Sequence, residues 1–151
     1  MAACSSTRET PPAFDRSYAL AGPLVPATTT MVSAWDIPAN PLEVLELDTS
    51  AQAARVRHGF LIFMNTPGEA GRLTHNHLSC GNCHLNAGQR EKALPLVGVS
   101  AVFPQYNKRA GRDFTLADRV VGCFMRSQNA TAGDAALEPQ SEEVQALVAY
   151  L

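Results

Sequence analysis

Five consecutive residues, Cys80-Gly81-Asn82-Cys83-His84, constrain this chain more than any other feature of its sequence. The C-x-x-C-H pattern is the attachment signature of a c-type haem. Its two thiols add across the haem vinyl groups as thioethers, and the histidine that follows is placed to ligate the iron. The two intervening residues let both sulfurs face one edge of the porphyrin. The motif therefore predicts a domain wrapped around one covalent haem c.

A zinc site or a disulfide is the alternative interpretation of a C-x-x-C pair. Zinc usually requires a second matching pair of ligands, whereas the remaining cysteines, Cys4 and Cys123, are isolated in the sequence. A disulfide does not need a histidine directly after it. The complete motif therefore favours haem over both.

Composition limits the overall organisation. A chain of 151 residues with 46% apolar content has the size of one domain with a core. The formal net charge of −2 argues against nucleic acid as a partner. Pro95 and Gly98 interrupt the longest apolar run, at residues 93–103, so no segment is suited to span a membrane.

The N-terminal region bears on location. Thioether attachment takes place outside the bacterial inner membrane, so we expect a periplasmic protein whose leader has been removed. Ala2-Ala3-Cys4 resembles the end of a bacterial lipobox, which makes Cys4 a candidate lipid anchor, with an ordinary loop cysteine as the alternative. Residues 1–30 are rich in Pro, Thr and Ser and are expected to form a flexible tether or arm.

Hydrophobic periodicity predicts helices at about 50–65, 115–126 and 141–151. The first has an apolar stripe and ends at Thr66-Pro67-Gly68; its stripe residues are Val56, Phe60, Phe63 and Met64. The second opens with a capping box at Thr115, and the third is capped by Ser141. The third helix has its own stripe and stops within that pattern, so we expect the natural gene to continue; the stripe residues are Val144, Leu147, Val148 and Leu151. The expected fold is mainly α, a class I cytochrome c-like domain over residues 31–151 after a long irregular lead-in.

Several residues are candidates for the surroundings of the haem. Pro95 lies where class I cytochromes c have a proline whose carbonyl accepts the ring N–H of the proximal histidine. An ordinary turn proline is the alternative. His58 lies on the face of its helix away from the apolar stripe, so it is expected to face solvent and not the iron. His75 and His77 lie so near Cys80 that neither is expected to reach the opposite face of the haem.

Cys123 and Met125 are the candidates for the sixth iron ligand. They lie about 200° apart around the second helix, so both cannot point at the haem. Met125 would give a plain electron-transfer cytochrome, whereas Cys123 would give a thiolate-bound iron of low potential.

Arg119, Cys123 and Ser127 stand four residues apart and share one face of this helix, which places a cation, a thiol and a hydroxyl side by side. The segment 107–127 has a formal charge of +3 in a chain whose remainder carries −5; its charged residues are Lys108, Arg109, Arg112, Asp113, Asp118, Arg119 and Arg126. A positive pocket in an acidic protein favours a small anionic substrate. A basic face that docks an acidic redox partner is the alternative.

Three segments carry a resemblance to a known family: residues 78–88, 103–107 and 119–127, of which Gly-Cys-Phe-Met-Arg-Ser is the most specific part. Together they resemble the catalytic haem domain of bacterial thiosulfate dehydrogenases, dihaem cytochromes c related to the SoxA cytochromes. The resemblance covers about residues 35–151. It implies oxidation of thiosulfate to tetrathionate at a His/Cys-ligated haem with an essential cysteine. By residue match, His84 and Cys123 would be the axial ligands, with Arg109, Arg119 and Ser127 around the anion.

Family members usually carry a second C-x-x-C-H domain, and this chain has one such motif. Joining two thiosulfates releases two electrons, whereas one haem iron stores one, so we expect a second haem domain or a partner cytochrome as electron acceptor. Cys123 would either carry sulfane sulfur covalently or tune the haem. A SoxA-like subunit that conjugates thiosulfate to a carrier protein, and a plain electron-transfer cytochrome with Met125 on the iron, remain as alternatives.

Overall fold

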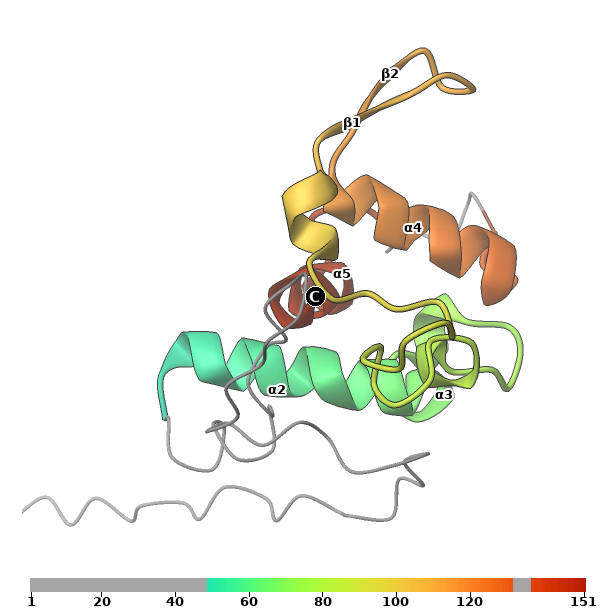
Figure 1. The fold of residues 1–151 in the computed structure, drawn as a ribbon. Helices are drawn as coiled ribbons and strands as arrows, with labels where there is room; N and C mark the ends of the chain where they lie inside the picture. The colour runs from blue at the N-terminus through green and yellow to red at the C-terminus, as the bar shows by residue number, and fades with distance from the viewer. Residues whose placement is uncertain (1–48, 132–136) are drawn as a thin grey trace, which may run out of the picture.

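The computed structural model describes residues 49–131 and 137–151. The predictions for Cys4, for the tether at residues 1–30 and for the lead-in up to residue 48 lie outside the described residues. Within them the fold is mainly α, as predicted (Figure 1). No helix in these two ranges has both the length and the apolar composition needed to cross a membrane.

Helix α2 spans Ala51–Met64, close to the prediction. Ser50 caps it, because its Oγ accepts a hydrogen bond from the backbone N–H of Ala53 at 3.1 Å. The helix ends at Asn65, and a second, short helix α3 (Thr66–Glu69) follows directly. The Thr-Pro-Gly sequence therefore ends one helix and begins another, since proline is tolerated in a first helical turn.

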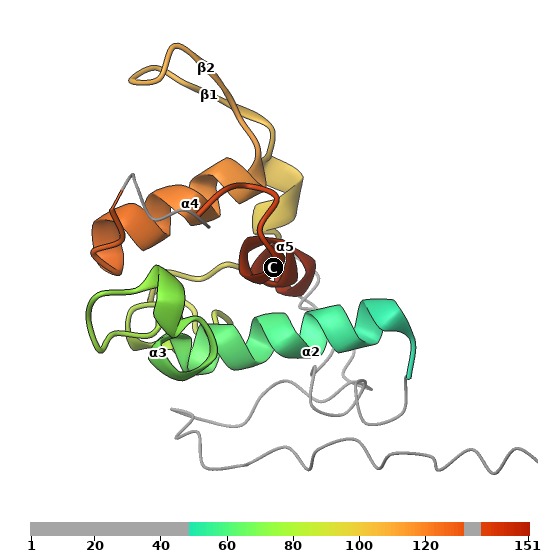
Figure 2. The same cartoon turned by 180° about the vertical axis from the view of Figure 1, so that it is seen from behind.

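Helix α5 (Glu142–Tyr150) crosses α2, and the two lie in contact in both views (Figures 1 and 2). Gly59 makes the close approach possible: a Cβ built on it would lie 2.0 Å from the carbonyl oxygen of Ala146. Tyr150 strengthens the crossing, since its ring packs edge-on against Phe60 and its hydroxyl donates to the carbonyl of Ala87 at 2.7 Å. Ser141 occupies the N-cap position of α5, as predicted, but its hydroxyl donates to the Glu138 carbonyl and makes no capping hydrogen bond.

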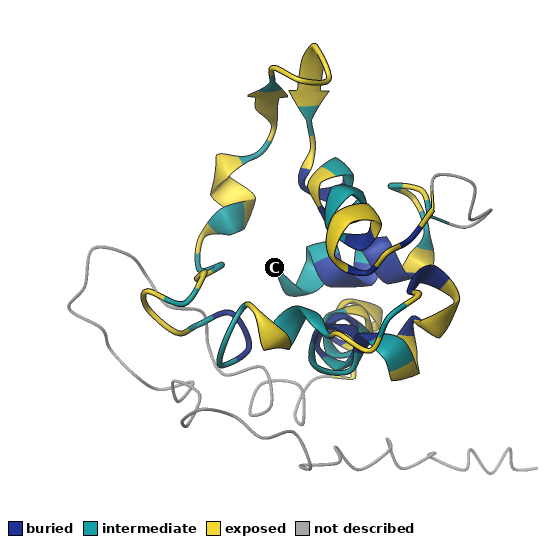
Figure 3. Cartoon of the chain, turned by 90° about the vertical axis from the view of Figure 1, so that its right-hand side faces the viewer, coloured by how far each residue is buried: buried dark blue, intermediate teal, exposed yellow. Residues whose placement is uncertain are grey.

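Helix α4 spans Leu116–Ser127 and covers the other side of α5. It begins with the predicted capping box, in which Thr115 and Asp118 bond each other's backbone N–H groups. The buried core lies where α2, α4 and α5 meet (Figure 3). Its largest fully buried side chains include Ile62, which lies off the predicted stripe of α2 because that helix is covered on more than one side.

Residues 105–114 form a β-hairpin that projects away from the helices (Figures 1 and 3). Strand β1 (Gln105–Asn107) pairs antiparallel with β2 (Arg112–Phe114). Asn107 shapes the turn, since its Oδ1 accepts from the backbone N–H groups of Arg109 and Ala110. Three short 3₁₀ segments complete the described fold: Gly71–Leu73, Cys80–Asn82 and Val99–Val102.

The carboxylate of Glu143 is buried in the first turn of α5 and bound by both arms of the Arg72 guanidinium at 2.6 Å. Burial acts to raise the pKa of Glu143, but the hydrogen bonds and charge of Arg72 outweigh it and hold that pKa below its ordinary value. Glu143→Gln should therefore destabilise the fold by about 1–3 kcal/mol at neutral pH. The exposed neighbour Glu142→Gln is the matched control and should change little.

The contribution of Glu143 to the stability of the fold should decrease at low pH. A carboxylate with a lowered pKa in the folded state stabilises the fold above its unfolded pKa, and this contribution is lost as the pH falls through the folded value. Thermal melts should therefore separate the wild type from Glu143→Gln at pH 7 and converge as the pH falls through the lowered pKa of Glu143. A separation that is constant from pH 7 to pH 3 would contradict the ion-pair account.

Candidate functional site

The C-x-x-C-H motif forms a tight turn after α3. Cys80–Asn82 is one turn of 3₁₀ helix, and the backbone N–H of His84 donates to the Cys80 carbonyl at 2.9 Å. Asn82 closes the turn, because its Oδ1 accepts from the N–H of Ser79 at 2.6 Å. Cys80 and Cys83 are free thiols in the structure.

Thr66 anchors this turn to the end of α2. Its side chain is fully buried; Oγ1 donates to the Ile62 carbonyl at 2.8 Å and accepts from the N–H of Cys80 at 3.2 Å. The Cys80 sulfur lies 3.5 Å from the same hydroxyl. Burial raises the pKa of the Cys80 thiol, and the hydrogen bond with Thr66 opposes that shift.

The ring of His84 is oriented by a backbone carbonyl, as predicted, but the carbonyl is that of Leu94 and not of Pro95. The Nδ1–O distance is 2.7 Å. Because a carbonyl oxygen only accepts, Nδ1 carries the proton and Nε2 presents its lone pair. The prediction was wrong by one residue, since the chain backbone turns at Leu94, which has a left-handed φ of 50°.

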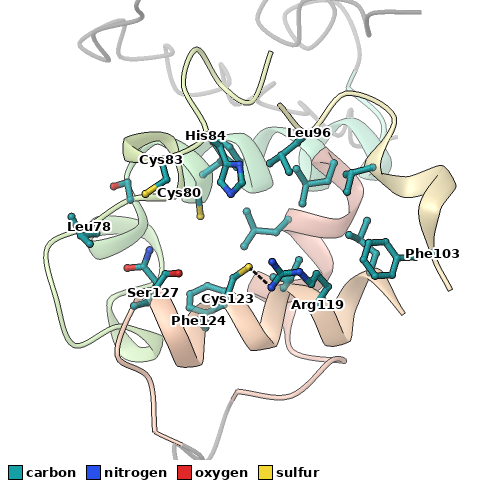
Figure 4. A pocket seen from close by; sticks show the side chains of 18 of the residues that line it. Leu78, Cys80, Cys83, His84, Leu96, Phe103, Arg119, Cys123, Phe124 and Ser127 are labelled. Atoms are coloured by element: carbon teal, nitrogen blue, oxygen red, sulfur yellow. Dashed lines mark hydrogen bonds between the residues drawn. The ribbon is translucent and has the colours of Figure 1, made fainter. Parts of the chain in front are cut away.

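A largely apolar cavity of about 340 Å³ lies between the C-x-x-C-H turn and α4 (Figure 4). Cys80, Cys83 and His84 form one wall, and Arg119, Cys123 and Ser127 line the opposite wall. Figure 4 shows Cys123 across the cavity from His84. The walls between are mainly apolar: Phe63, Leu78, Leu96, Val99, Val102, Phe103, Leu116, Val120, Phe124, Leu147 and Leu151.

Arg119 contacts Cys123 directly. Its Nη1 donates to the cysteine sulfur at 3.3 Å, one helical turn further along α4. Met125 is 42% exposed and does not line the cavity. Of the two candidate sulfur ligands, the structure brings only Cys123 to the cavity.

Arg109 does not line this cavity, contrary to the prediction that it shares a pocket with Cys123. It lines a separate surface groove of about 580 Å³ between the hairpin and α4. Arg119 and Phe103 line both the groove and the cavity, so the two spaces adjoin. Residues 105–114 form a hairpin that carries Arg109 outward from the cavity and into this adjoining groove.

The groove is strongly cationic, with four basic side chains and no acidic one in its lining: Lys108, Arg109, Arg119 and Arg126. Arg112, the fifth basic residue of the segment, is bound to Asp118 at 2.7 Å. That hydrogen bond, together with those from Thr115, holds the pKa of Asp118 far below its ordinary value. The pair ties β2 to α4 and leaves the other cations available for a small anion.

Gln128 is a cavity residue that the sequence analysis did not single out. It is 4% exposed and lines the cavity. The signal that was overlooked is its spacing, because it continues the buried line of Leu116, Val120 and Phe124 at four-residue intervals. A polar residue on an apolar line requires a partner.

These residues fit a c-type haem. Two free thiols, two residues apart in the sequence, line an apolar cavity, the adjacent histidine has Nε2 available, and a sulfur lies on the opposite wall. A structural zinc site requires four such donors around one point, whereas His84 and Cys123 lie on opposite sides of the space.

The SoxA/TsdA cytochrome c domain family matches residues 71–151, more than half of the chain. The chain belongs to this family. Membership implies haem c and confirms the predicted cytochrome c fold. The matched range contains the C-x-x-C-H turn, α4 and α5, and hence both main walls of the cavity.

Relatives of this SoxA/TsdA domain are thiosulfate dehydrogenases. One from Psychrobacter arcticus is 38% identical over 98 residues, which is 65% of this chain and 29% of that protein. Another from Stutzerimonas stutzeri is 34% identical over 110 residues, or 73% of this chain and 34% of that protein. The solved thiosulfate dehydrogenase (TsdBA) of Marichromatium purpuratum superposes with a TM-score of 0.62 at 29% identity, covering 69% of this chain and 23% of that one. The chain thus spans about a quarter to a third of the length of these relatives.

Proposed function

We propose that this domain oxidises thiosulfate to tetrathionate with one haem c, which Cys80 and Cys83 would hold covalently and whose iron His84 and Cys123 would ligate. The observation that carries the proposal is the placement of Cys123 across the cavity from His84, with Arg119 donating to its sulfur. The similarity to thiosulfate dehydrogenases supports the choice of substrate.

The haem supplies an iron that accepts one electron at a time. The residues of the chain supply the rest. Arg119 and Ser127 flank Cys123 on α4 and offer charge-assisted and hydroxyl hydrogen bonds to a sulfur oxyanion. Arg109 and its cationic neighbours in the groove concentrate the anion at the entrance and offset the repulsion between two dianions.

Cys123 has two candidate roles. As a nucleophile, its thiolate would form a disulfide bond with the outer sulfur of a first thiosulfate, with two electrons passing to the haem iron and the proposed acceptor in turn. The outer sulfur of the second thiosulfate would then attack that thiosulfate sulfur, releasing tetrathionate and the Cys123 thiolate. As a permanent ligand, it would lower the potential of the iron. The contact with Arg119 serves both roles, because a cationic donor stabilises negative charge on the sulfur.

The number of electrons released requires a second electron acceptor besides the one haem iron. Two thiosulfate dianions form one tetrathionate dianion and release two electrons, and one iron stores one of them. We propose a second haem domain or a separate partner cytochrome as the acceptor, in the periplasm, where c-type haem is attached. A lipid anchor at Cys4 stays a prediction. Thiosulfate oxidation that runs equally fast with and without any second cytochrome would contradict the need for a partner.

The function is tested with the haem-loaded chain, thiosulfate and a one-electron acceptor of high potential. We expect one tetrathionate for every two thiosulfates consumed, without any carrier protein. Turnover that appears only when a protein with a reactive cysteine is added would favour a SoxA-like conjugating subunit instead. The EPR spectrum of the oxidised protein tests the ligands independently, because thiolate and thioether sulfur perturb the iron differently.

Arg119 and Arg109 should contribute unequally to kcat/KM. Arg119→Gln should lower kcat/KM by about 1–3 kcal/mol equivalent, because Arg119 contacts Cys123 and lines both spaces. Arg109→Gln should have a smaller effect, mainly on KM and at low ionic strength, since Arg109 lines only the groove. Steady-state rates at low and high salt measure both.

Arg55→Gln, an exposed substitution on α2, is the matched control and should leave kcat/KM unchanged. If Arg119→Gln lowers only the melting temperature and leaves kcat/KM at the wild-type value, then this arginine stabilises the fold and does not bind substrate.

A further inference from the structure

Gln128 is a buried residue whose side chain lines the cavity. The residue is 4% exposed, lines the cavity, and stands directly after Ser127 at the end of α4. Its Oε1 accepts from the Thr74 hydroxyl at 3.1 Å. Within residues 49–131 and 137–151 no group accepts a hydrogen bond from Nε2. Nε2 is not fully enclosed by protein atoms, so it can donate to a group that binds in the cavity.

Neighbouring hydrogen bonds fix the orientation of this amide. The Thr74 hydroxyl holds Oε1, and the Gln128 carbonyl accepts from the backbone N–H of His75 at 2.8 Å. Asn76 adds a third tie through Nδ2, which donates to the Ser127 carbonyl at 2.7 Å. Residues 74–76 therefore hold the end of α4 and place Oε1 toward Thr74, which leaves Nε2 for the cavity.

The position of Gln128 along the cavity indicates what it binds. Figure 4 shows Arg119 and Phe103 at one end of the space and Ser127, Leu78 and Cys83 at the other, with Cys123 between Arg119 and Ser127. Gln128 follows Ser127 and is bonded to the segment that runs into Cys80. It therefore lies at the thioether end, whereas the propionate acceptors of a haem lie on the edge opposite its vinyl groups.

We propose that Gln128 is a substrate-binding residue, whose Nε2–H donates to a sulfonate oxygen of the thiosulfate held at Cys123. The inference rests on the proposed function and extends it. Arg119 would bind the anion on one side of Cys123, and Ser127 and Gln128 would bind it on the other. Three donors around one sulfur suit an anion that offers several oxygens at fixed angles, and they orient its outer sulfur toward Cys123.

The test uses the oxidised, haem-loaded chain without an electron acceptor, titrated with sodium thiosulfate while the haem absorption spectrum is followed. Gln128→Met keeps the shape of the side chain and removes the donor, so Kd should rise about tenfold. Gln128→Glu places a carboxylate against the anion and should raise Kd at least about 100-fold. Gln140→Met, the same change at an exposed position, is the matched control and should bind like the wild type.

Thr74→Val supplies a second, independent variant, because it keeps Gln128 but releases Oε1. Kd should rise less than in Gln128→Met, with the haem content unchanged. A Kd in Gln128→Met equal to that of the wild type overturns the inference and leaves the proposed function standing. A changed spectrum of the anion-free protein with an unchanged Kd also overturns it, since the amide would then serve the haem. If the wild type itself does not respond to thiosulfate, the proposed function fails and the inference fails with it.

Discussion

Cys123→Ala should lower the rate of thiosulfate oxidation by at least about 10³-fold while the haem stays attached. The sulfur is the one soft, nucleophilic group on the wall opposite His84, and Arg119 is directed at it. Attachment depends on Cys80 and Cys83, which lie on the other wall. Tetrathionate formation measures the first effect, and mass spectrometry of the intact chain measures the second.

Met125→Leu is the control for this prediction. Met125 is exposed and lies away from the cavity, so its replacement should change neither turnover nor the EPR spectrum. The reverse pattern, with an inactive Met125→Leu and an active Cys123→Ala, would contradict this prediction. It would indicate that Met125 is the sixth iron ligand and that the domain is a plain electron-transfer cytochrome.

Gly59→Ala should destabilise the described core strongly. The added Cβ would lie 2.0 Å from the Ala146 carbonyl oxygen and 2.8 Å from the Cβ of Tyr150. Relief requires the backbones of α2 and α5 to separate, because a helix backbone cannot yield as a flexible side chain does. We expect a loss of at least about 2 kcal/mol in unfolding free energy, or roughly 10 °C in Tm.

Gly71→Ala is the matched control, since no atom lies within 4 Å of a Cβ built there. Its Tm should stay within about 2 °C of the wild type. If Gly59→Ala melts like Gly71→Ala, the close crossing of α2 and α5 does not exist in solution. Both melts should be run on the haem-loaded protein, so that differences in haem content do not enter the comparison.

Local sequence signals predicted the helices well, because their causes are local. The Ser50 cap, the Thr115 capping box and the apolar stripes each act within a few residues, and α2, α4 and α5 follow from them. The hairpin was missed because its strands are three residues long and mostly exposed, so they carry no alternation of apolar and polar residues.

The sequence predicted the arrangement of site residues only where these residues lie on a single helix. Arg119, Cys123 and Ser127 share a helix face, and spacing alone groups them. The displacement of Arg109 depends on the path of a hairpin, and the choice of the Leu94 carbonyl depends on a backbone turn; no residue pattern encodes either. Gln128 is recognised only when the packing of residues 74–76 is known.

The position of Arg119 between cavity and groove has a thermodynamic consequence. One guanidinium that serves both spaces links the binding of an anion in the groove to the charge at the Cys123 sulfur. By reciprocity, an anion that binds the oxidised protein more tightly than the reduced protein lowers the reduction potential by the same free energy. The reduction potential of the haem iron should therefore fall as thiosulfate is added, and Arg119→Gln should weaken that dependence. A reduction potential that does not depend on thiosulfate would show that the cavity and the groove act separately.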